Sequence, residues 1–254
     1  MANGPPTIRS MASPSDTSDT RPLIRVGHKG ADHVAPGNTP ASFEAALDLG
    51  VDMIEFDVMP LRDGALVLAH DPEDATSRSP LTLEQGLDHF AAEAYNGIEL
   101  DVDLKIPGYE REVVEGLRER GLLGRSLISS TYPESLELVR ELDADVRRGL
   151  SVPRARRDYT EHQLLKFVAY GVVLWWRSGL PAKAERALRR GECEALMVHH
   201  LLVTRQLIAR VKRAGGQLYV WTVDDRDRIA RLEALGVDAV ITNDPRLFGR
   251  APAA

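Results

Sequence analysis

The alternation of short apolar runs with amphipathic runs constrains the fold of this chain more than any other feature. The apolar runs, often rich in β-branched residues, are candidate strands at Leu23–Gly27, Met53–Val58, Ala65–Ala69, Ile98–Leu104, Ser126–Ser129, Val146–Val152, Ala195–Val198, Gln217–Val223 and Ala239–Ile241. Segments of helical character lie between most of them, at 40–49, 82–93, 110–120, 133–142, 160–178, 182–190, 204–214 and 225–235. Repeated strand–helix units form parallel sheets. About eight such units favour a closed α/β barrel over an open doubly wound sheet.

The connection between the second and third candidate strands is too short for a crossover helix. Residues 59–64 join the two strands, and Asp63-Gly64 is typical of a hairpin turn. We therefore expect a strand that runs past the barrel rim, turns and comes back. That path would return His70 to the rim near Glu55 and Asp57.

Size, charge and cysteine content narrow the class of protein. A chain of 254 residues can bury a core as a single domain without disulfides or a structural metal. The formal net charge of −6 argues against binding to nucleic acid as the main activity. The single cysteine, Cys193, excludes an intrachain disulfide and a cysteine-based zinc site.

The ends of the chain and its longest apolar run bear on location. Residues 1–22 lack the apolar stretch of a secretory signal, and their polar composition predicts a disordered tail before one barrel domain at residues 23–249. Phe167–Trp176 is shorter than the roughly 18 apolar residues of a membrane span. It packs against the barrel or, with the basic segment Lys183–Arg190, forms an interfacial patch that touches lipid. We expect a cytoplasmic protein, with peripheral membrane contact as the second interpretation.

Two candidate strands carry acidic side chains on one face. Glu55 and Asp57 are two residues apart, so they project to one side while their neighbours are apolar. Asp101, Asp103 and Lys105 share one face of a later strand in the same way. In a solvated edge strand this pattern is unremarkable, but a parallel barrel is covered on both faces. Buried carboxylates repel unless they are protonated or bridged by a cation. Oxygen ligands without cysteine favour Mg²⁺ or Ca²⁺ over Zn²⁺.

Histidines end two of the candidate strands. His28 follows the first strand, and His70 follows the strand that returns from the hairpin. The carboxyl ends of barrel strands form the rim where active sites lie. Because imidazole titrates near neutral pH, two histidines beside the carboxylates indicate acid–base catalysis. His199 and His200 also end a strand and are weaker candidates.

These residues lie in motifs that resemble the signature of the glycerophosphodiester phosphodiesterases. That signature reads HRG, PENT, ExDV, DG and HD, followed by ELK, WTVN and GVDGIITDxP. The corresponding residues are His28-Lys29-Gly30, Pro36-Gly37-Asn38-Thr39, Glu55-Phe56-Asp57-Val58, Asp63-Gly64, His70-Asp71, Asp103-Leu104-Lys105, Trp221-Thr222-Val223-Asp224 and Gly236-Val237-Asp238 with Ile241-Thr242-Asn243-Asp244-Pro245. The ordered set, which runs from Ile24 to Leu247, is far more specific than any single motif.

The resemblance implies a single-domain TIM (β/α)8 barrel that hydrolyses glycerophosphodiesters to an alcohol and glycerol 3-phosphate. It also implies a divalent cation, Mg²⁺ or Ca²⁺, and a small-molecule phosphodiester as the binding partner. The residues carried over by motif are Glu55, Asp57 and Asp103 for the cation, His28 and His70 for acid–base catalysis, Lys29 and Lys105 for the phosphate, and Trp221 for the pocket wall. Which histidine is the acid, and the oligomeric state, stay open.

The chain also departs from these motifs. Lys29 replaces the arginine of HRG, so a point charge replaces a planar fork. Gly37 replaces the glutamate of PENT. Asp103 is shorter than the glutamate of ELK, and Asp101 on the same face could assist or replace it. Residues 71–81 are shorter than the insertion usual in the family, so we expect a more open site.

The departures leave two alternatives to the implied activity. A more open site would admit a bulkier diester, which favours a lysophospholipid or phosphoinositide phosphodiesterase of the same barrel type. The changed motif positions suggest instead a non-catalytic phosphate-binding barrel. The presence of both His28 and His70 argues against this second alternative.

Overall fold

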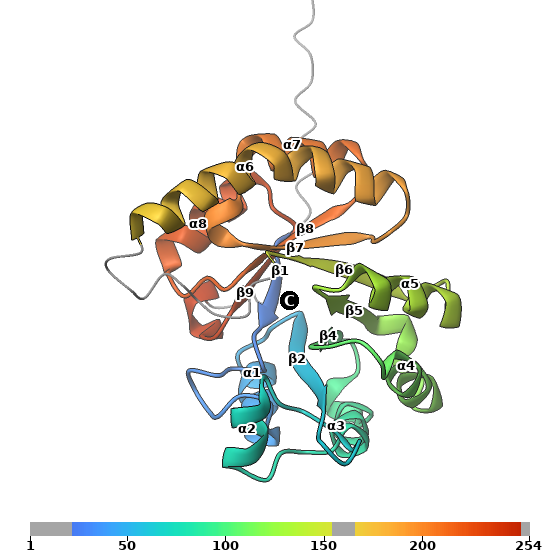
Figure 1. The fold of residues 1–254 in the computed structure, drawn as a ribbon. Helices are drawn as coiled ribbons and strands as arrows, with labels where there is room; N and C mark the ends of the chain where they lie inside the picture. Colours follow the sequence, from blue (N-terminus) through green and yellow to red (C-terminus); the bar gives the residue numbers. More distant parts are fainter. Residues whose placement is uncertain (1–21, 154–165, 250–254) are drawn as a thin grey trace, which may run out of the picture.

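A closed barrel of parallel strands forms the centre of the computed structural model, which describes residues 22–153 and 166–249. Within these residues the parallel strands are β1 (Ile24–Gly27), β2 (Met53–Pro60), β4 (Glu99–Leu104), β5 (Ser126–Ser130), β6 (Arg147–Val152), β7 (Ala195–His199), β8 (Gln217–Trp221) and β9 (Ala239–Thr242) (Figure 1). The sheet closes because β1 pairs with both β9 and β2. The predicted α/β barrel is therefore confirmed, whereas the predicted tail lies almost wholly outside the described residues.

Helices surround the barrel and cover the outward faces of its strands (Figure 1). They are α1 (Pro40–Asp48), α2 (Pro72–Ser77), α3 (Leu83–Phe90), α4 (Glu110–Glu119), α5 (Pro133–Leu142), α6 (Lys166–Arg189), α7 (Arg205–Arg213) and α8 (Arg226–Leu235). Phe56 of β2 shows how these layers pack: its ring lies 4.9 Å from that of Phe90 and 6.3 Å from that of Phe43. The apolar positions of β2 thus face the helices, and its acidic positions face the barrel interior.

The predicted hairpin is present between β2 and β3 (Leu66–Val67). The two strands are antiparallel, with Met59 opposite Val67, and no helix lies between them in this part of the described chain. β3 is shorter than the predicted strand at Ala65–Ala69. The chain then enters α2, which was not predicted. Asp71 begins this helix because its carboxylate accepts hydrogen bonds from the amides of Glu73 and Asp74.

The helix α6 corrects one prediction. The sequence predicted two helices that meet near Pro181, but the structure has a single helix that contains this proline. A proline inside a helix removes one backbone hydrogen bond and favours a break. Burial compensates here: Leu180, Ala184 and Leu188 lie in the same apolar cluster as residues of α7. This packing holds the helix continuous.

The apolar stretch at 167–176 belongs to α6, but its side chains lie outside the described part of the structure. Its orientation toward the barrel or toward lipid therefore stays a prediction. In the described residues, no helix combines the length and the apolar character that crossing a membrane requires.

The barrel interior is layered from apolar to polar. Its lower layer contains Val26, Met53, Leu127 and Tyr219, all buried in one cluster. Side chains two residues further along β2 and β4 are acidic. The alternation therefore places Glu55, Asp57, Asp101 and Asp103 further toward the carboxyl ends of the strands than Met53.

Candidate active site

Three carboxylates meet at the carboxyl ends of β2 and β4. Asp57 lies directly opposite Asp103 in the parallel register, one step above the pair of Glu55 and Asp101. Glu55, Asp57 and Asp103 each offer one oxygen, and these oxygens lie within 4.8 Å of one another. Glu55 and Asp57 are buried. The predicted cation-binding residues are therefore brought together, and such a cluster could hold a metal ion.

Lys105 supplies the positive charge inside this cluster. Its ammonium forms ion pairs with Asp57 Oδ1 and with Asp103 Oδ2, the latter at 2.5 Å. Burial alone would lower the pKa of Lys105, but the carboxylates of Asp103 and Asp57 raise it well above its ordinary value. Burial likewise raises the pKa of Asp57, yet Lys105 and the two histidines lower it below its ordinary range. Asp57 and Lys105 are therefore a charged pair at neutral pH.

Glu55 and Asp101 behave differently from Asp57. Burial, followed by the charge of Asp57, raises the pKa of Glu55 well above its ordinary value. Burial also raises the pKa of Asp101 to about 8, and Ser129 Oγ donates a hydrogen bond to Asp101 Oδ1 at 2.6 Å. Asp101 thus sits deeper and is protonated near neutrality, whereas Asp103 reaches the cluster. Because the pKa of Glu55 is raised as well, geometry decides between the two: Asp103 belongs to the group of oxygens that lie within 4.8 Å of one another, which favours Asp103 as the ligand from β4.

The two predicted histidines both lie near the carboxylates. His28 Nε2 lies 3.8 Å from Glu55 Oε2, and His28 Nδ1 lies 2.5 Å from Asn243 Oδ1. Burial lowers the pKa of His28, and the nearby Asp57 partly offsets this effect. His70 is half exposed and lies close enough to Asp57 to lower the pKa of that carboxyl. The hairpin therefore returns His70 to the site, as the sequence predicted.

The loop after β1 holds the carboxylates of β2 from above. Lys29, with a positive φ of 50°, donates its backbone amide to Glu55 Oε2 at 2.8 Å. Asn38, with a φ of 57°, donates its side-chain amide to Asp57 Oδ2 at 2.9 Å and accepts from the Asp57 amide at 3.1 Å. Asn38 is part of a motif in the sequence, but no function was predicted for it. Its place beside Gly37 in that motif was the available signal.

Asp32 fills the space beside Gly37. Its Oδ1 accepts a hydrogen bond from the Gly37 amide at 2.8 Å, and its Oδ2 accepts one from Lys29 Nζ at 3.0 Å. A β-carbon placed on Gly37 would lie 2.6 Å from Asp32 Oδ1 and 2.8 Å from the β-carbon of Lys29. The loop therefore has room for the Asp32 carboxylate or for a side chain at position 37, but not for both.

We expect Gly37→Ala to destabilise the protein by about 1–3 kcal/mol, the usual cost of overpacking. The added methyl group must push aside the partly buried Asp32 carboxylate and the β-carbon of Lys29. Denaturant unfolding of the wild type and the variant measures the loss. Gly124→Ala is the matched control, because a β-carbon there meets nothing within 4 Å. An equal stability for both variants would contradict the proposed crowding.

Trp221 is the last residue of β8, which ends two residues before the predicted strand, and it lies beside His199, the last residue of β7. Its ring lies edge-on to that of His199, with centroids 5.1 Å apart, and the rings of His199 and His200 are 4.3 Å apart. His200 Nδ1 lies 2.8 Å from the carbonyl oxygen of Thr222. Trp221, His199 and His200 therefore form an aromatic section of the rim, which contains both weaker histidine candidates.

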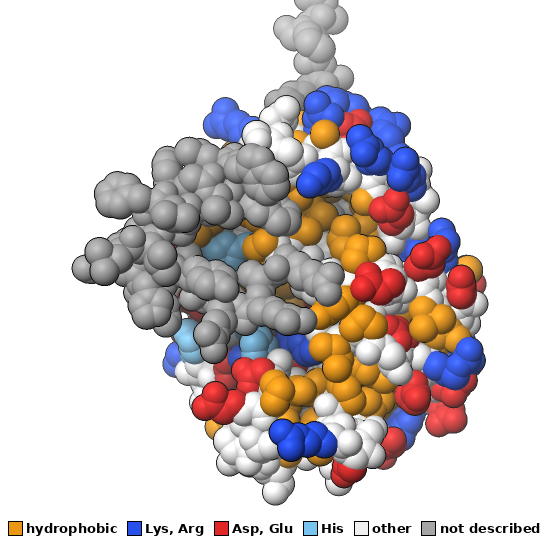
Figure 2. Space-filling model, in the orientation of Figure 1, with side chains coloured by type: hydrophobic (Ala, Val, Ile, Leu, Met, Phe, Trp, Pro, Cys, Tyr) orange, Lys and Arg blue, Asp and Glu red, His pale blue; other side chains and the backbone are white. Residues whose placement is uncertain are grey.

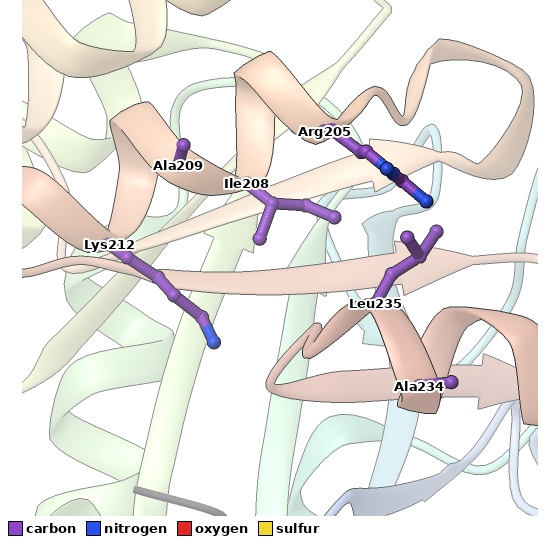
Figure 3. A pocket seen from close by; sticks show the side chains of 6 residues that line it. All are labelled: Arg205, Ile208, Ala209, Lys212, Ala234 and Leu235. Carbon is purple, nitrogen blue, oxygen red and sulfur yellow. The ribbon is translucent and has the colours of Figure 1, made fainter. Parts of the chain in front are cut away.

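The surface around the site is rich in charged side chains. Figure 2 shows histidine, acidic and basic side chains close together on the viewed face. A separate groove lies on the outer helical layer, and it is lined by Arg205, Ile208, Ala209, Lys212, Ala234 and Leu235 (Figure 3). Its lining contains none of the predicted site residues, so the barrel rim remains the candidate site.

Comparisons with known proteins agree with this geometry. The profile of the Glycerophosphoryl diester phosphodiesterase family matches residues 28–80 and 75–247. A glycerophosphodiester phosphodiesterase of Caldanaerobacter subterraneus is 27% identical over 87% of this chain and 93% of its own. A putative glycerophosphoryl diester phosphodiesterase of Silicibacter pomeroyi superposes with a TM-score of 0.68 at 19% identity, over 89% of this chain and 91% of that one.

A third comparison includes a bound product. An Oleispira antarctica phosphodiesterase, solved in complex with the product sn-glycerol-3-phosphate, superposes with a TM-score of 0.63 at 22% identity. The match covers 89% of this chain and 94% of the Oleispira chain. Both structural matches support the barrel fold.

Proposed function

This chain belongs to the glycerophosphoryl diester phosphodiesterase family, and from that membership we propose that it hydrolyses glycerophosphodiesters to an alcohol and glycerol 3-phosphate. Like its relatives, it is a phosphodiesterase, a hydrolase. The observation that carries the specific proposal is the barrel rim, where a carboxylate cluster, Lys105 and two histidines lie together. These are the groups that phosphodiester hydrolysis requires.

We propose that Glu55, Asp57 and Asp103 hold one divalent cation, Mg²⁺ or Ca²⁺. All three are oxygen donors, and Asp57 Oδ1 is a buried atom with no hydrogen-bond partner among the described residues, although Lys105 forms an ion pair with it. Such a donor set suits a hard cation. When bound, the cation would offset negative charge on the phosphoryl oxygens.

The remaining residues of the site have two roles: the lysines bind the phosphate and the histidines transfer protons. Lys29 and Lys105 would attract the phosphate, because both carry a positive charge at the rim beside the carboxylate cluster. One histidine takes the proton of the attacking hydroxyl, which belongs to water or to the glycerol moiety itself. Attack by the glycerol hydroxyl gives a cyclic glycerophosphate, which water then opens to glycerol 3-phosphate. The other histidine protonates the leaving alcohol oxygen. His28 and His70 approach the cluster from different strands, which suits opposite roles.

The proposal is tested by incubating the purified protein with glycerophosphocholine in the presence of Mg²⁺ or Ca²⁺. We expect release of glycerol 3-phosphate, measured by phosphorus NMR, and of choline, measured by proton NMR. Lysophosphatidylcholine serves as the second substrate, because the short segment 71–81 favours a more open site. Release of lysophosphatidic acid from that lipid, without glycerol 3-phosphate from glycerophosphocholine, would replace the proposed substrate by the alternative.

A peripheral membrane contact through residues 167–176 is a separate hypothesis. Co-sedimentation with anionic vesicles tests it, and absence of binding would remove it.

A non-catalytic phosphate-binding barrel is the remaining alternative, and it predicts phosphate binding without turnover of either substrate. His28 and His70 both lie at the site, and this placement favours catalysis over simple binding.

A further inference from the structure

Three consecutive strands of the barrel end in side chains that form one hydrogen-bonded chain. Asp224 follows β8, Asn243 follows β9 and His28 follows β1. Asn243 Nδ2 donates to Asp224 Oδ2 at 2.7 Å, and Asn243 Oδ1 lies 2.5 Å from His28 Nδ1. The chain therefore runs from an exposed carboxylate, through an amide, to the imidazole at the carboxylate cluster.

The direction of each hydrogen bond follows from the groups involved. A carboxylate only accepts, so Asn243 must turn its NH₂ group toward Asp224. Its carbonyl oxygen then faces His28, and this oxygen also only accepts. His28 Nδ1 must therefore carry the hydrogen, and the neutral ring has its lone pair on Nε2, the nitrogen nearer Glu55.

The carboxylate at the start of this chain is fixed in place. Asp224 Oδ1 accepts from the Asn243 backbone amide at 2.8 Å and from Thr242 Oγ1 at 2.9 Å. Its two oxygens thus bind three donors of the strand end that carries Asn243. A reversed Asn243 amide would place its oxygen against the Asp224 carboxylate, which is unfavourable.

We propose that Asp224 and Asn243 are positioning residues that hold His28 as its Nδ1–H tautomer, so that Nε2 is the atom that accepts a proton. This inference rests on the proposed phosphodiesterase activity and deepens it. It assigns the role of base to His28 and leaves the role of acid to His70. It also assigns a function to two residues outside the predicted site.

The motif comparison gives this pair a further meaning. The strings WTVN and GVDGIITDxP have an amide at the position of Asp224 and a carboxylate at the position of Asn243. This chain has the two groups exchanged. In both arrangements, residue 243 offers an oxygen that accepts a hydrogen bond from His28 Nδ1, and an amide and a carboxylate bond each other between positions 224 and 243. The substitution at one position therefore compensates for the substitution at the other.

The test uses Asp224→Asn, Asn243→Asp and the double exchange Asp224→Asn/Asn243→Asp, with Asp225→Asn as the matched control. Asp225 caps α8 by accepting from the Arg228 amide, a role that asparagine also fills. The readouts are kcat and KM with glycerophosphocholine, and the nitrogen-15 NMR shifts of the His28 ring without substrate. A His28→Gln variant assigns those signals.

In the wild type we expect protonated Nδ1 and unprotonated Nε2. Asp224→Asn lets the Asn243 amide reverse, so the tautomer should invert and kcat should fall about tenfold to a hundredfold with KM little changed. The double exchange should restore both the tautomer and most of kcat, while the control should match the wild type. Restoration by a second substitution is not expected from a merely structural role.

Two results would overturn the inference: an Nε2–H tautomer in the wild type, or a double exchange more impaired than either single variant. The NMR reading requires no activity. If the wild type released no glycerol 3-phosphate but carried the Nδ1–H tautomer, the proposed function would fail and the positioning of His28 would stand.

Discussion

Removal of divalent cations is expected to abolish the hydrolysis of glycerophosphocholine, and Mg²⁺ or Ca²⁺ should restore it. In the proposed site the phosphate binds beside Glu55, Asp57 and Asp103, and Lys105 forms ion pairs with Asp57 and Asp103. At about 4 Å and an effective dielectric constant near 20, two like charges repel by about 4 kcal/mol, roughly a thousandfold in rate. Without the cation, Lys105 must offset both the carboxylates and the phosphate.

The measurement combines activity with a binding readout. Protein treated with EDTA and then dialysed is assayed across a titration of each cation, and its thermal unfolding midpoint is recorded in parallel, because a ligand of the native state raises that midpoint. Glu55→Gln should weaken both responses, since it keeps the shape of the side chain and replaces the carboxylate by an amide that cannot become anionic. Glu112→Gln, on the exposed face of α4, is the control. Full turnover in chelator, with no shift of the midpoint, would contradict the cation site.

The parts of the molecule that the sequence predicted best are those determined by local pattern. Apolar runs separated by helical segments predicted the closed barrel and placed strand ends within two residues of those observed. The Asp63-Gly64 turn predicted the antiparallel return of β3, and thus the approach of His70 to Asp57. In each case neighbouring residues carry the information, because strand alternation and turn geometry are local properties.

What the sequence did not predict depends on closure of the barrel. β1 lies between β9 and β2, so Asn243 meets His28 although 215 residues separate them. Asn38 reaches Asp57 across the same junction. The periodic pattern of apolar residues does not predict such contacts between side chains of different strands and loops. The continuity of α6 through Pro181 was missed for a similar reason. Proline predicts a helix break from the local sequence, whereas the helix is held continuous by packing on α7.

The sequence also did not predict how deep each acidic side chain lies in the barrel. Asp101 and Asp103 share one face of β4, so alternation could not choose between them as ligand. The difference arises from β5, whose Ser129 hydroxyl bonds Asp101 below the rim. Asp103 instead belongs to the oxygen cluster with Glu55 and Asp57, which makes it the better placed ligand from β4.

His28→Ala and His70→Ala are each expected to lower kcat for glycerophosphocholine by about a hundredfold to ten-thousandfold, with little change in KM. Each removes a group that transfers a proton in the transition state and contributes little to substrate affinity. Steady-state kinetics at saturating cation measure the effect, and circular dichroism checks the fold. His33→Ala is the control, because His33 is an exposed residue of the same loop as His28. Unchanged turnover in either variant would remove that histidine from the mechanism.

A substrate with an activated leaving group separates the two histidines. Glycerophospho-p-nitrophenol releases a weakly basic phenolate, which needs no proton from the enzyme, so loss of the acid should cost little with this ester. We expect His70→Ala to regain most of its activity, because half-exposed His70 is the acid in our assignment. His28→Ala should stay impaired, since the attacking hydroxyl still needs a base. The reverse result would exchange the two roles, and the hydrogen-bonded chain from Asp224 would then hold the proton donor.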